Sequence, residues 1–121
     1  MTPPPARFAV LAHHHPVPGY PVPHFDLLLE DPALPGEHRC RTWRLPLDPT
    51  STAAPIPAEP LPPHRAHYLD HAGTVSGGRG WVEHADRGTL VWLSDDPVRV
   101  KLTGRYLTGV WSISGGVFAR A

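Results

Sequence analysis

The sequence predicts a single all-β domain, a small antiparallel β-barrel or sandwich with long proline-rich loops. The chain has 121 residues, a usual size for one domain, and its 17 prolines and 11 glycines are too many for a helix bundle. Sixteen prolines precede His64 and nine glycines follow it, so the first half should be rich in loops and the second in turns. Short apolar stretches of strand length lie between these breakers.

The predicted strands are short and are separated by proline or glycine turns. The clearest is Val98-Arg99-Val100-Lys101-Leu102, whose strict alternation predicts an apolar inner face and a charged outer face. Cys40 and Trp43 are candidate inward residues, and the proline-rich segment 48–63 is predicted to be an extended, mobile surface connection without secondary structure. The predicted strands are 8–12, 24–30, 39–45, 66–70, 80–85, 89–94, 98–103 and 105–113.

Charge and cysteine content exclude several classes of protein. Eleven basic and eleven acidic residues give no net charge, which excludes binding of nucleic acid by overall charge but leaves local patches open. Cys40 is the sole cysteine, so a disulfide framework and a thiolate zinc site are excluded. We expect residues 1–6 to be a disordered leader, residues 7–121 to form one domain, and the protein to be cytoplasmic.

Histidine is the residue type most suggestive of chemistry, with nine copies. On a strand, His24 and Asp26 share one face while the odd-numbered apolar side chains around them face the core. Imidazole nitrogens and carboxylate oxygens are metal ligands, and a third ligand is available from His13, His14 or His15 if the two strands pair. The alternative reading is a solvated strand face with a weak ion pair.

A second polar cluster follows the proline-rich segment. His64 and Tyr68 are four residues apart, on one face of either a strand or a helical turn, with Arg65 between them. Such groups can donate hydrogen bonds to a phosphate, and an imidazole can transfer a proton. The glycine-rich turn 76–80 carries Arg79 and can hold an anion on its backbone amides. The alternatives are an amphipathic strand with Tyr68 packed inward and an ordinary hairpin turn.

Several stretches are similar, in order along the chain, to one known family. They are HFDLLLE at 24–30, RTWRLP at 41–46, HRAHY at 64–68, DRGT at 86–89 and the stretch 98–111. The corresponding family patterns are HYDFRLE, KSWAVP, a His and a Tyr four residues apart, DRGT and a last hairpin. From about Arg7 to its end, the chain resembles the 3′-phosphoesterase domain of bacterial DNA ligase D, and in particular its short stand-alone relatives.

The resemblance implies a small β-barrel with a divalent metal ion, Mn²⁺ or else Zn²⁺, held by His13, His24 and Asp26. It also implies that His64 and Tyr68 contact the substrate phosphate and act in catalysis. The implied reaction removes a 3′-terminal ribonucleoside or phosphate from a primer–template DNA end and leaves a 3′-hydroxyl. A DNA ligase or another end-joining protein is the implied partner.

Two departures from the family pattern bear on catalysis. The family's arginine two residues after the aspartate is Leu28 here, which removes a bidentate contact to phosphate. Arg65 or Arg79 can replace the family's arginine only from another element of the structure. The loop before His24 is also longer than in the family, which leaves the choice among the three successive histidines open. The alternative function is a non-catalytic metal-binding module that binds a nucleic-acid end or docks on a repair ligase.

Overall fold

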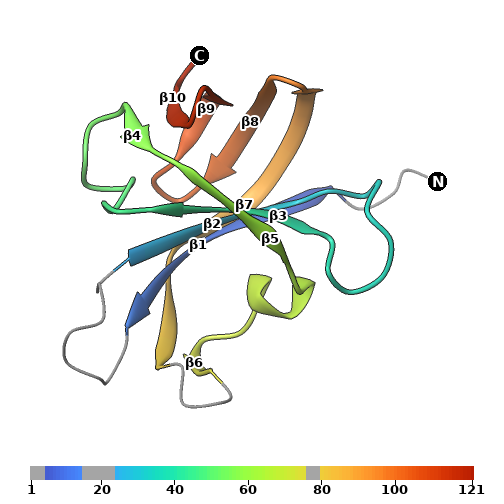
Figure 1. The fold of residues 1–121 in the computed structure, drawn as a ribbon, viewed down its shortest axis with the longest axis vertical. Coiled ribbons are helices and arrows are strands. Elements are labelled where there is room, and N and C mark those ends of the chain that lie inside the picture. Colours follow the sequence, from blue (N-terminus) through green and yellow to red (C-terminus); the bar gives the residue numbers. More distant parts are fainter. Residues whose placement is uncertain (1–4, 15–23, 76–79) are drawn as a thin grey trace.

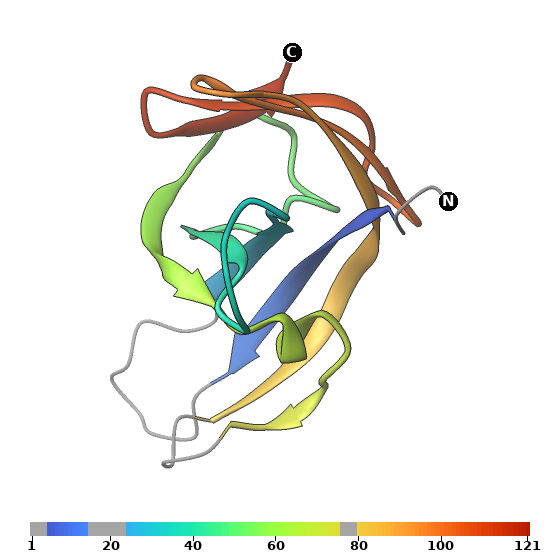
Figure 2. The ribbon, with the colours of Figure 1, turned by 90° about the vertical axis from the view of Figure 1, so that its right-hand side faces the viewer.

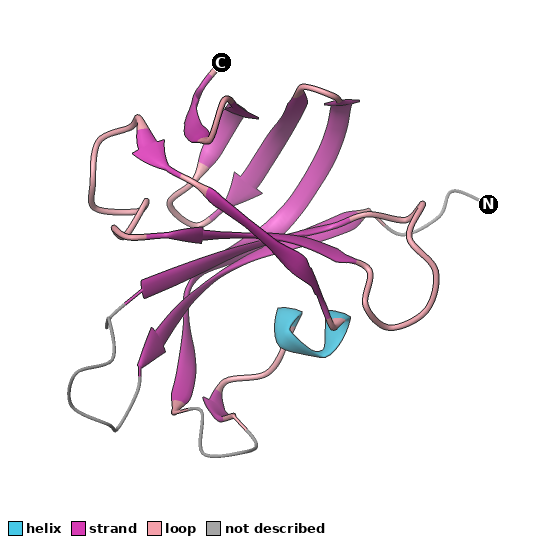
Figure 3. Cartoon of the chain, viewed as in Figure 1, coloured by secondary structure: helices cyan, strands magenta, loops and turns pink. Residues whose placement is uncertain are grey.

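The computed structural model describes residues 5–14, 24–75 and 80–121. Its strands form one antiparallel sheet in the order β4-β10-β9-β8-β7-β1-β2-β3-β5, with β6 paired to β7 (Figure 1). The short helix η1 (Ala66–Leu69) lies outside this sheet (Figure 3). The strands are β1 (Ala6–His14), β2 (His24–Glu30), β3 (Cys40–Leu45), β4 (Ile56–Pro57), β5 (Glu59–His64), β6 (Gly73–Thr74), β7 (Trp81–Asp95), β8 (Val98–Gly104), β9 (Thr108–Ser114) and β10 (Val117–Arg120).

The segment 56–64 closes the sheet into a barrel. β4 and β5 stand at opposite ends of the strand order but follow one another in the sequence, because β4 pairs with β10 and β5 pairs with β3 (Figure 2). The predicted all-β antiparallel barrel is therefore confirmed. The prediction that 48–63 lacks secondary structure is wrong, because prolines are tolerated where a strand pairs on one side only and Ile56 is 1% exposed in the core.

The barrel core is apolar and continuous. The predicted inward face of 98–102 is confirmed, with its three apolar residues buried and its two basic residues exposed. The core residues of β1, β2 and the last three strands include Phe8, Val10, Leu27, Leu29, Val100, Leu102, Trp111 and Phe118. The inner face of the sheet is therefore closed to solvent, and a site that reacts with a ligand must lie on its outer face.

A second apolar cluster lies on the outer side of the barrel, beneath η1. It contains Ala9, Leu11, Leu28, Cys40, Ala66, Leu69 and Val82. β1 and β2 are thus buried on both faces, which explains why both are continuous apolar runs in the sequence. Cys40 and Trp43 are both buried, as predicted, but they belong to the outer cluster and the barrel core respectively.

Three predicted elements differ from the structure. The strand predicted at 66–70 is the helix η1, because Ala66 and Leu69 are buried at a spacing of three residues, which suits a 3₁₀ turn. The strands predicted at 80–85 and 89–94 are one strand, β7, which passes through Gly88 without turning. A Cβ at Gly88 would lie 2.0 Å from the carbonyl oxygen of Thr103, so this glycine serves close strand approach and not a turn.

Near both ends of the chain, the observed strand bounds differ from the predicted ones. β1 begins at Ala6, one residue inside the predicted leader, and residues 1–4 lie outside the described residues. The strand predicted at 105–113 begins only at Thr108, and β10 follows it through Gly115 and Gly116, whose φ angles of 58° and 76° favour glycine. Within the described ranges, no helix is long and apolar enough to cross a membrane.

Candidate functional site

The pairing of β1 with β2 brings the predicted metal ligands together. The two strands are antiparallel, with His13 directly opposite His24 and Leu11 opposite Asp26. His13 and Asp26 are therefore diagonal neighbours, and all three polar side chains lie on the outer face of the barrel. The pairing on which the sequence prediction depended is present.

The ligand atoms of His13, His24 and Asp26 all lie within 4.8 Å of one another. The carboxylate is 3.8 Å from His13 Nδ1 through Oδ2 and 3.8 Å from His24 Nε2 through Oδ1. Two ligands that are each about 2.1 Å from one ion in tetrahedral geometry lie about 3.4 Å apart, so binding would shorten each ligand–ligand distance by at most about 1.4 Å. This group can hold a metal ion.

The surroundings of the Asp26 carboxylate favour a bound cation. Its side chain is buried, and its Oδ1 accepts no hydrogen bond from any residue that the structure describes. The neighbouring charge is the Arg44 guanidinium, whose Nε lies 3.9 Å from Oδ1. A buried carboxylate oxygen without a donor is unfavourable, and a bound cation is one way to satisfy it.

The structure separates the three successive histidines. His14 points to the other side of β1, where its ring stacks on Trp81 at 4.2 Å and its Nε2 lies 3.2 Å from Glu83 Oε1. Adjacent residues on a strand face opposite ways, so His14 is not in the group with Asp26. His15 lies outside the described residues. Of the two histidines that can be compared, His13 is the candidate ligand.

A small cavity joins the metal group to the second predicted cluster. It measures about 80 Å³ and is lined by Leu11, His13, Asp26, His64, Tyr68, Val75 and Val82. His64 ends β5, and Tyr68 lies on η1, so segments far from β1 and β2 in the sequence supply one wall. Such a volume holds an ion with a few waters.

The hydrogen bonds of His64 fix which nitrogen is available for chemistry. Its Nδ1 lies 3.0 Å from the carbonyl oxygen of Pro62, so Nδ1–H is the donor and Nε2 remains for a ligand. Beside it, the guanidinium of Arg65 lies 5.8 Å from the centre of the Tyr68 ring. Arg65 is thus near the cavity, whereas Arg79 lies outside the described residues.

Arg44 is a site residue that the sequence analysis missed. It lies directly opposite Asp26 on β3, and its Nε is buried while its side chain is 42% exposed. Leu28, at the family's arginine position, is fully buried in the cluster beneath η1. A guanidinium is therefore present beside the aspartate, but it comes from the neighbouring strand. The available signal was that the predicted strands 24–30 and 39–45 follow one another in the sequence, as the two strands of a hairpin do.

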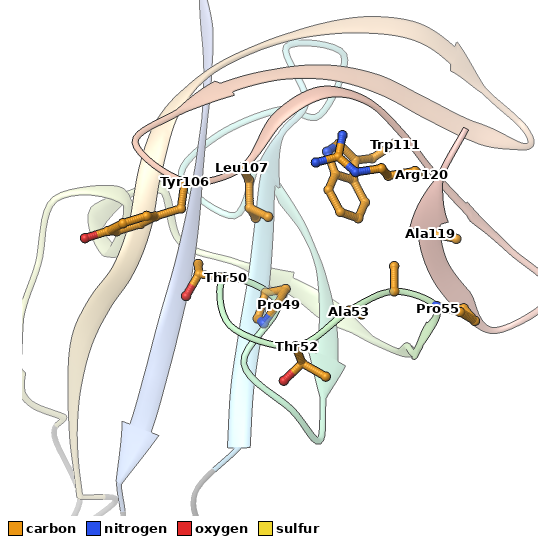
Figure 4. A pocket seen from close by; sticks show the side chains of 11 residues that line it. Pro49, Thr50, Thr52, Ala53, Pro55, Tyr106, Leu107, Trp111, Ala119 and Arg120 are labelled. Carbon is orange, nitrogen blue, oxygen red and sulfur yellow. The ribbon is translucent and has the colours of Figure 1, made fainter.

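A more spacious cavity lies apart from this group. It measures about 530 Å³ and lies between the loop that carries Pro49 and Pro55 and the strands that carry Trp111 and Arg120 (Figure 4). Among the described residues that line it there is no imidazole and no carboxylate, so they offer no histidine or carboxylate metal ligand and no acid–base pair. The chemistry therefore points to the smaller cavity.

The sole cysteine takes no part in this chemistry. Burial, with a smaller effect from the Glu30 carboxylate, raises the pKa of the Cys40 thiol from 9.0 to about 11. A neutral buried thiol is neither a nucleophile nor a metal ligand at neutral pH.

No protein-family model and no curated protein matches this chain. The resemblance to the ligase D phosphoesterase therefore stays a prediction.

Proposed function

We propose that this barrel is a divalent-metal-dependent phosphoesterase that removes a 3′-ribonucleoside or a 3′-phosphate from DNA ends. The observation that carries the proposal is the single small cavity lined by His13 and Asp26 of the metal group and by His64 and Tyr68. Metal ligands beside an imidazole and a phenol can together catalyse the hydrolysis of a phosphate ester.

Each residue has a distinct role in the proposed reaction. His13, His24 and Asp26 would hold the cation, with Mn²⁺ as the first candidate and Zn²⁺ as the second, and it would neutralise phosphate charge and activate water. Water adds to phosphorus and gives a proton to His64 Nε2, the ester P–O bond breaks, and His64 returns that proton to the departing oxygen. Tyr68 donates a hydrogen bond to a phosphate oxygen. Arg44, beside Asp26, supplies the guanidinium that the family has at the position of Leu28.

The second candidate is a metal-binding module without catalysis. Leu28 favours it, because a buried leucine stands where the family has an arginine. In this case the barrel would bind a DNA 3′ end or dock on a DNA ligase or another end-joining protein. A cytoplasmic location belongs to both proposals.

Metal binding is tested by thermal unfolding in MnCl₂ and in ZnCl₂. Binding to the folded state raises Tm by mass action, and His24→Ala should abolish the rise. His14→Ala is the matched control, because its ring lies on the opposite side of β1, and it should keep the full rise. No rise with either ion, or equal rises in both variants, would contradict the metal site.

Turnover separates the two candidates. A primer–template with a 3′-terminal ribonucleotide or a 3′-phosphate is incubated with the protein and MnCl₂, and products are resolved by gel electrophoresis. We expect a 3′-hydroxyl product that is lost in His64→Ala and reduced at least tenfold in Arg44→Ala. Metal binding without product would favour the module over the enzyme.

A further inference from the structure

A second polar cleft lies next to the candidate site. It measures about 420 Å³ and is lined by His84, Ala85, Asp86, Arg87, Arg105 and Tyr106. Arg87 comes from β7 and Arg105 from the connection between β8 and β9, so two separate segments each supply a guanidinium. Both arginines are exposed. The cleft therefore presents two permanent positive charges to solvent.

The carboxylate in this cleft does not pair with these arginine side chains. Asp86 is buried and accepts four backbone N–H groups, from Arg87 at 2.8 Å, Arg105 at 2.9 Å, Tyr106 at 3.1 Å and Leu107 at 2.8 Å. No carboxylate of a described residue lies within ion-pair distance of either guanidinium. The charges that face solvent are thus positive, which suits an anion.

An exposed aromatic ring stands at the edge of the same cleft. Tyr106 is 56% exposed, and the Arg105 guanidinium lies 5.4 Å from its ring centre. Tyr106 also lines the 530 Å³ cavity, where Arg120 lies 4.6 Å from the ring centre of Trp111 (Figure 4). Arginines beside aromatic rings are typical of surfaces that bind single-stranded nucleic acid, on which bases stack and phosphates pair with cations.

The cleft is linked to the cavity at the metal group. His84 lines the cleft, and its Nε2–H donates to the carbonyl oxygen of Tyr68 at 3.2 Å. Tyr68 and Val82 line the metal-group cavity, and Arg87 is five residues beyond Val82 on β7, on the order of 15 Å away. This span corresponds to a few nucleotides of one strand.

We propose that Arg87, Arg105 and Tyr106 bind the single-stranded DNA that leads to the 3′ end held at the metal group. The two guanidinium groups contact backbone phosphates, and the Tyr106 ring stacks on a base. The direction of the bound strand, with its 3′ end at the metal group, rests on the proposed function. The strand binding itself does not require that the protein cleave anything.

The test is fluorescence anisotropy with a labelled single-stranded oligonucleotide that ends in a 3′-hydroxyl, measured in EDTA over a range of NaCl concentrations. The Arg87→Ala/Arg105→Ala variant should bind at least tenfold more weakly and should lower the salt slope by about 1.4, since each phosphate contact contributes about 0.7. Tyr106→Ala should weaken binding about tenfold with an unchanged slope. Lys101→Ala, which removes an exposed charge elsewhere on β8, is the control and should bind like the wild type.

Three results would overturn the proposal. They are wild-type protein that does not bind the oligonucleotide, arginine variants that bind like the Lys101→Ala control, and inorganic phosphate that binds as tightly as the oligonucleotide. Thermal unfolding of each variant establishes that it is folded. Strand binding that depends on Arg87 and Arg105 in a protein with no metal-induced rise in Tm would retain this inference and reject the proposed function.

Discussion

Two aspartates are equally buried in this barrel and are bonded in opposite ways. Asp26 and Asp86 are each 4% exposed. Asp86 accepts four backbone N–H groups, whereas Asp26 Oδ1 accepts none from the described part of the chain. Buried polar groups are normally bonded, so the fold satisfies both oxygens of Asp86 and leaves Oδ1 of Asp26 without a hydrogen-bond donor among the described residues.

The difference separates a carboxylate that stabilises the fold from one that is available to a ligand. Asp86 ties β7 to the residues that follow β8, and Gly104 leaves room for it. Asp26 faces two imidazoles at 3.8 Å, at the edge of a small cavity. Two equally buried aspartates thus have different roles, because the hydrogen-bond donors around a buried carboxylate, and not its burial, decide whether its charge is satisfied.

The largest expected effect is that of Asp86→Asn on stability. The amide replaces an acceptor oxygen by an NH₂ donor that faces backbone donors, and the charge that strengthened four hydrogen bonds is lost. We expect the free energy of unfolding to fall by about 3–5 kcal/mol, measured by urea denaturation. A loss below about 1 kcal/mol would show that the four bonds do not stabilise the fold.

Gly104→Ala should have the next largest effect on stability. A Cβ at this position would lie 2.6 Å from Asp86 Oδ2 and 2.6 Å from Phe8 Cζ, so either the carboxylate or the core ring must move. Overpacking of this kind should lower the free energy of unfolding by about 2 kcal/mol in the same assay. A variant as stable as the wild type would mean that Asp86 tolerates displacement, and the comparison of the two aspartates would weaken.

Cys40 extends the comparison to a buried group whose pKa is raised chiefly by burial. Its pKa is raised from 9.0 to about 11, so between these pH values the unfolded thiol loses its proton while the folded thiol keeps it. Its contribution is therefore complete below pH 9 and is lost as the pH rises towards 11. At pH 10 the loss should be about 1.4 kcal/mol, measured as the difference in urea stability between wild type and Cys40→Ala. A difference in stability between wild type and Cys40→Ala that does not change with pH would contradict the raised pKa of Cys40.

Asp26→Asn should have the smallest effect on stability and a decisive effect on metal binding. Without metal, the variant loses a charge that the fold leaves partly unsatisfied, so the free energy of unfolding should change by less than about 1 kcal/mol. With MnCl₂ or ZnCl₂, the rise in Tm should disappear. A large loss of stability without metal would mean that Asp26, like Asp86, serves the fold.

The sequence alone was sufficient for the two strands that carry the metal group, β1 and β2. HFDLLLE at 24–30 has the length and composition of a strand, and two-residue periodicity places His24 and Asp26 together on one face and Leu27 and Leu29 on the other. The preceding apolar stretch indicated a strand that ends at the histidines, and β1 does so. Local pattern sufficed here because two-residue periodicity is a property of a single strand.

Other features depend on pairing and were not predictable in this way. Arg44 opposes Asp26 because of the register between β2 and β3, and a shift of one residue would have placed it on the other face. The helix η1 and the closing segment 56–64 also depend on the surfaces that they cover.

The sequence by itself determined the β class, the apolar core and the residue types that can bind a cation and a phosphate. Only the tertiary structure decided that His13 and not His14 stands with Asp26, that His64 and Tyr68 line the same cavity, and that Asp86 is satisfied. The physical reason is that side-chain type and local periodicity are encoded residue by residue. Which groups share a face, a cavity or a donor is set by contacts between distant segments.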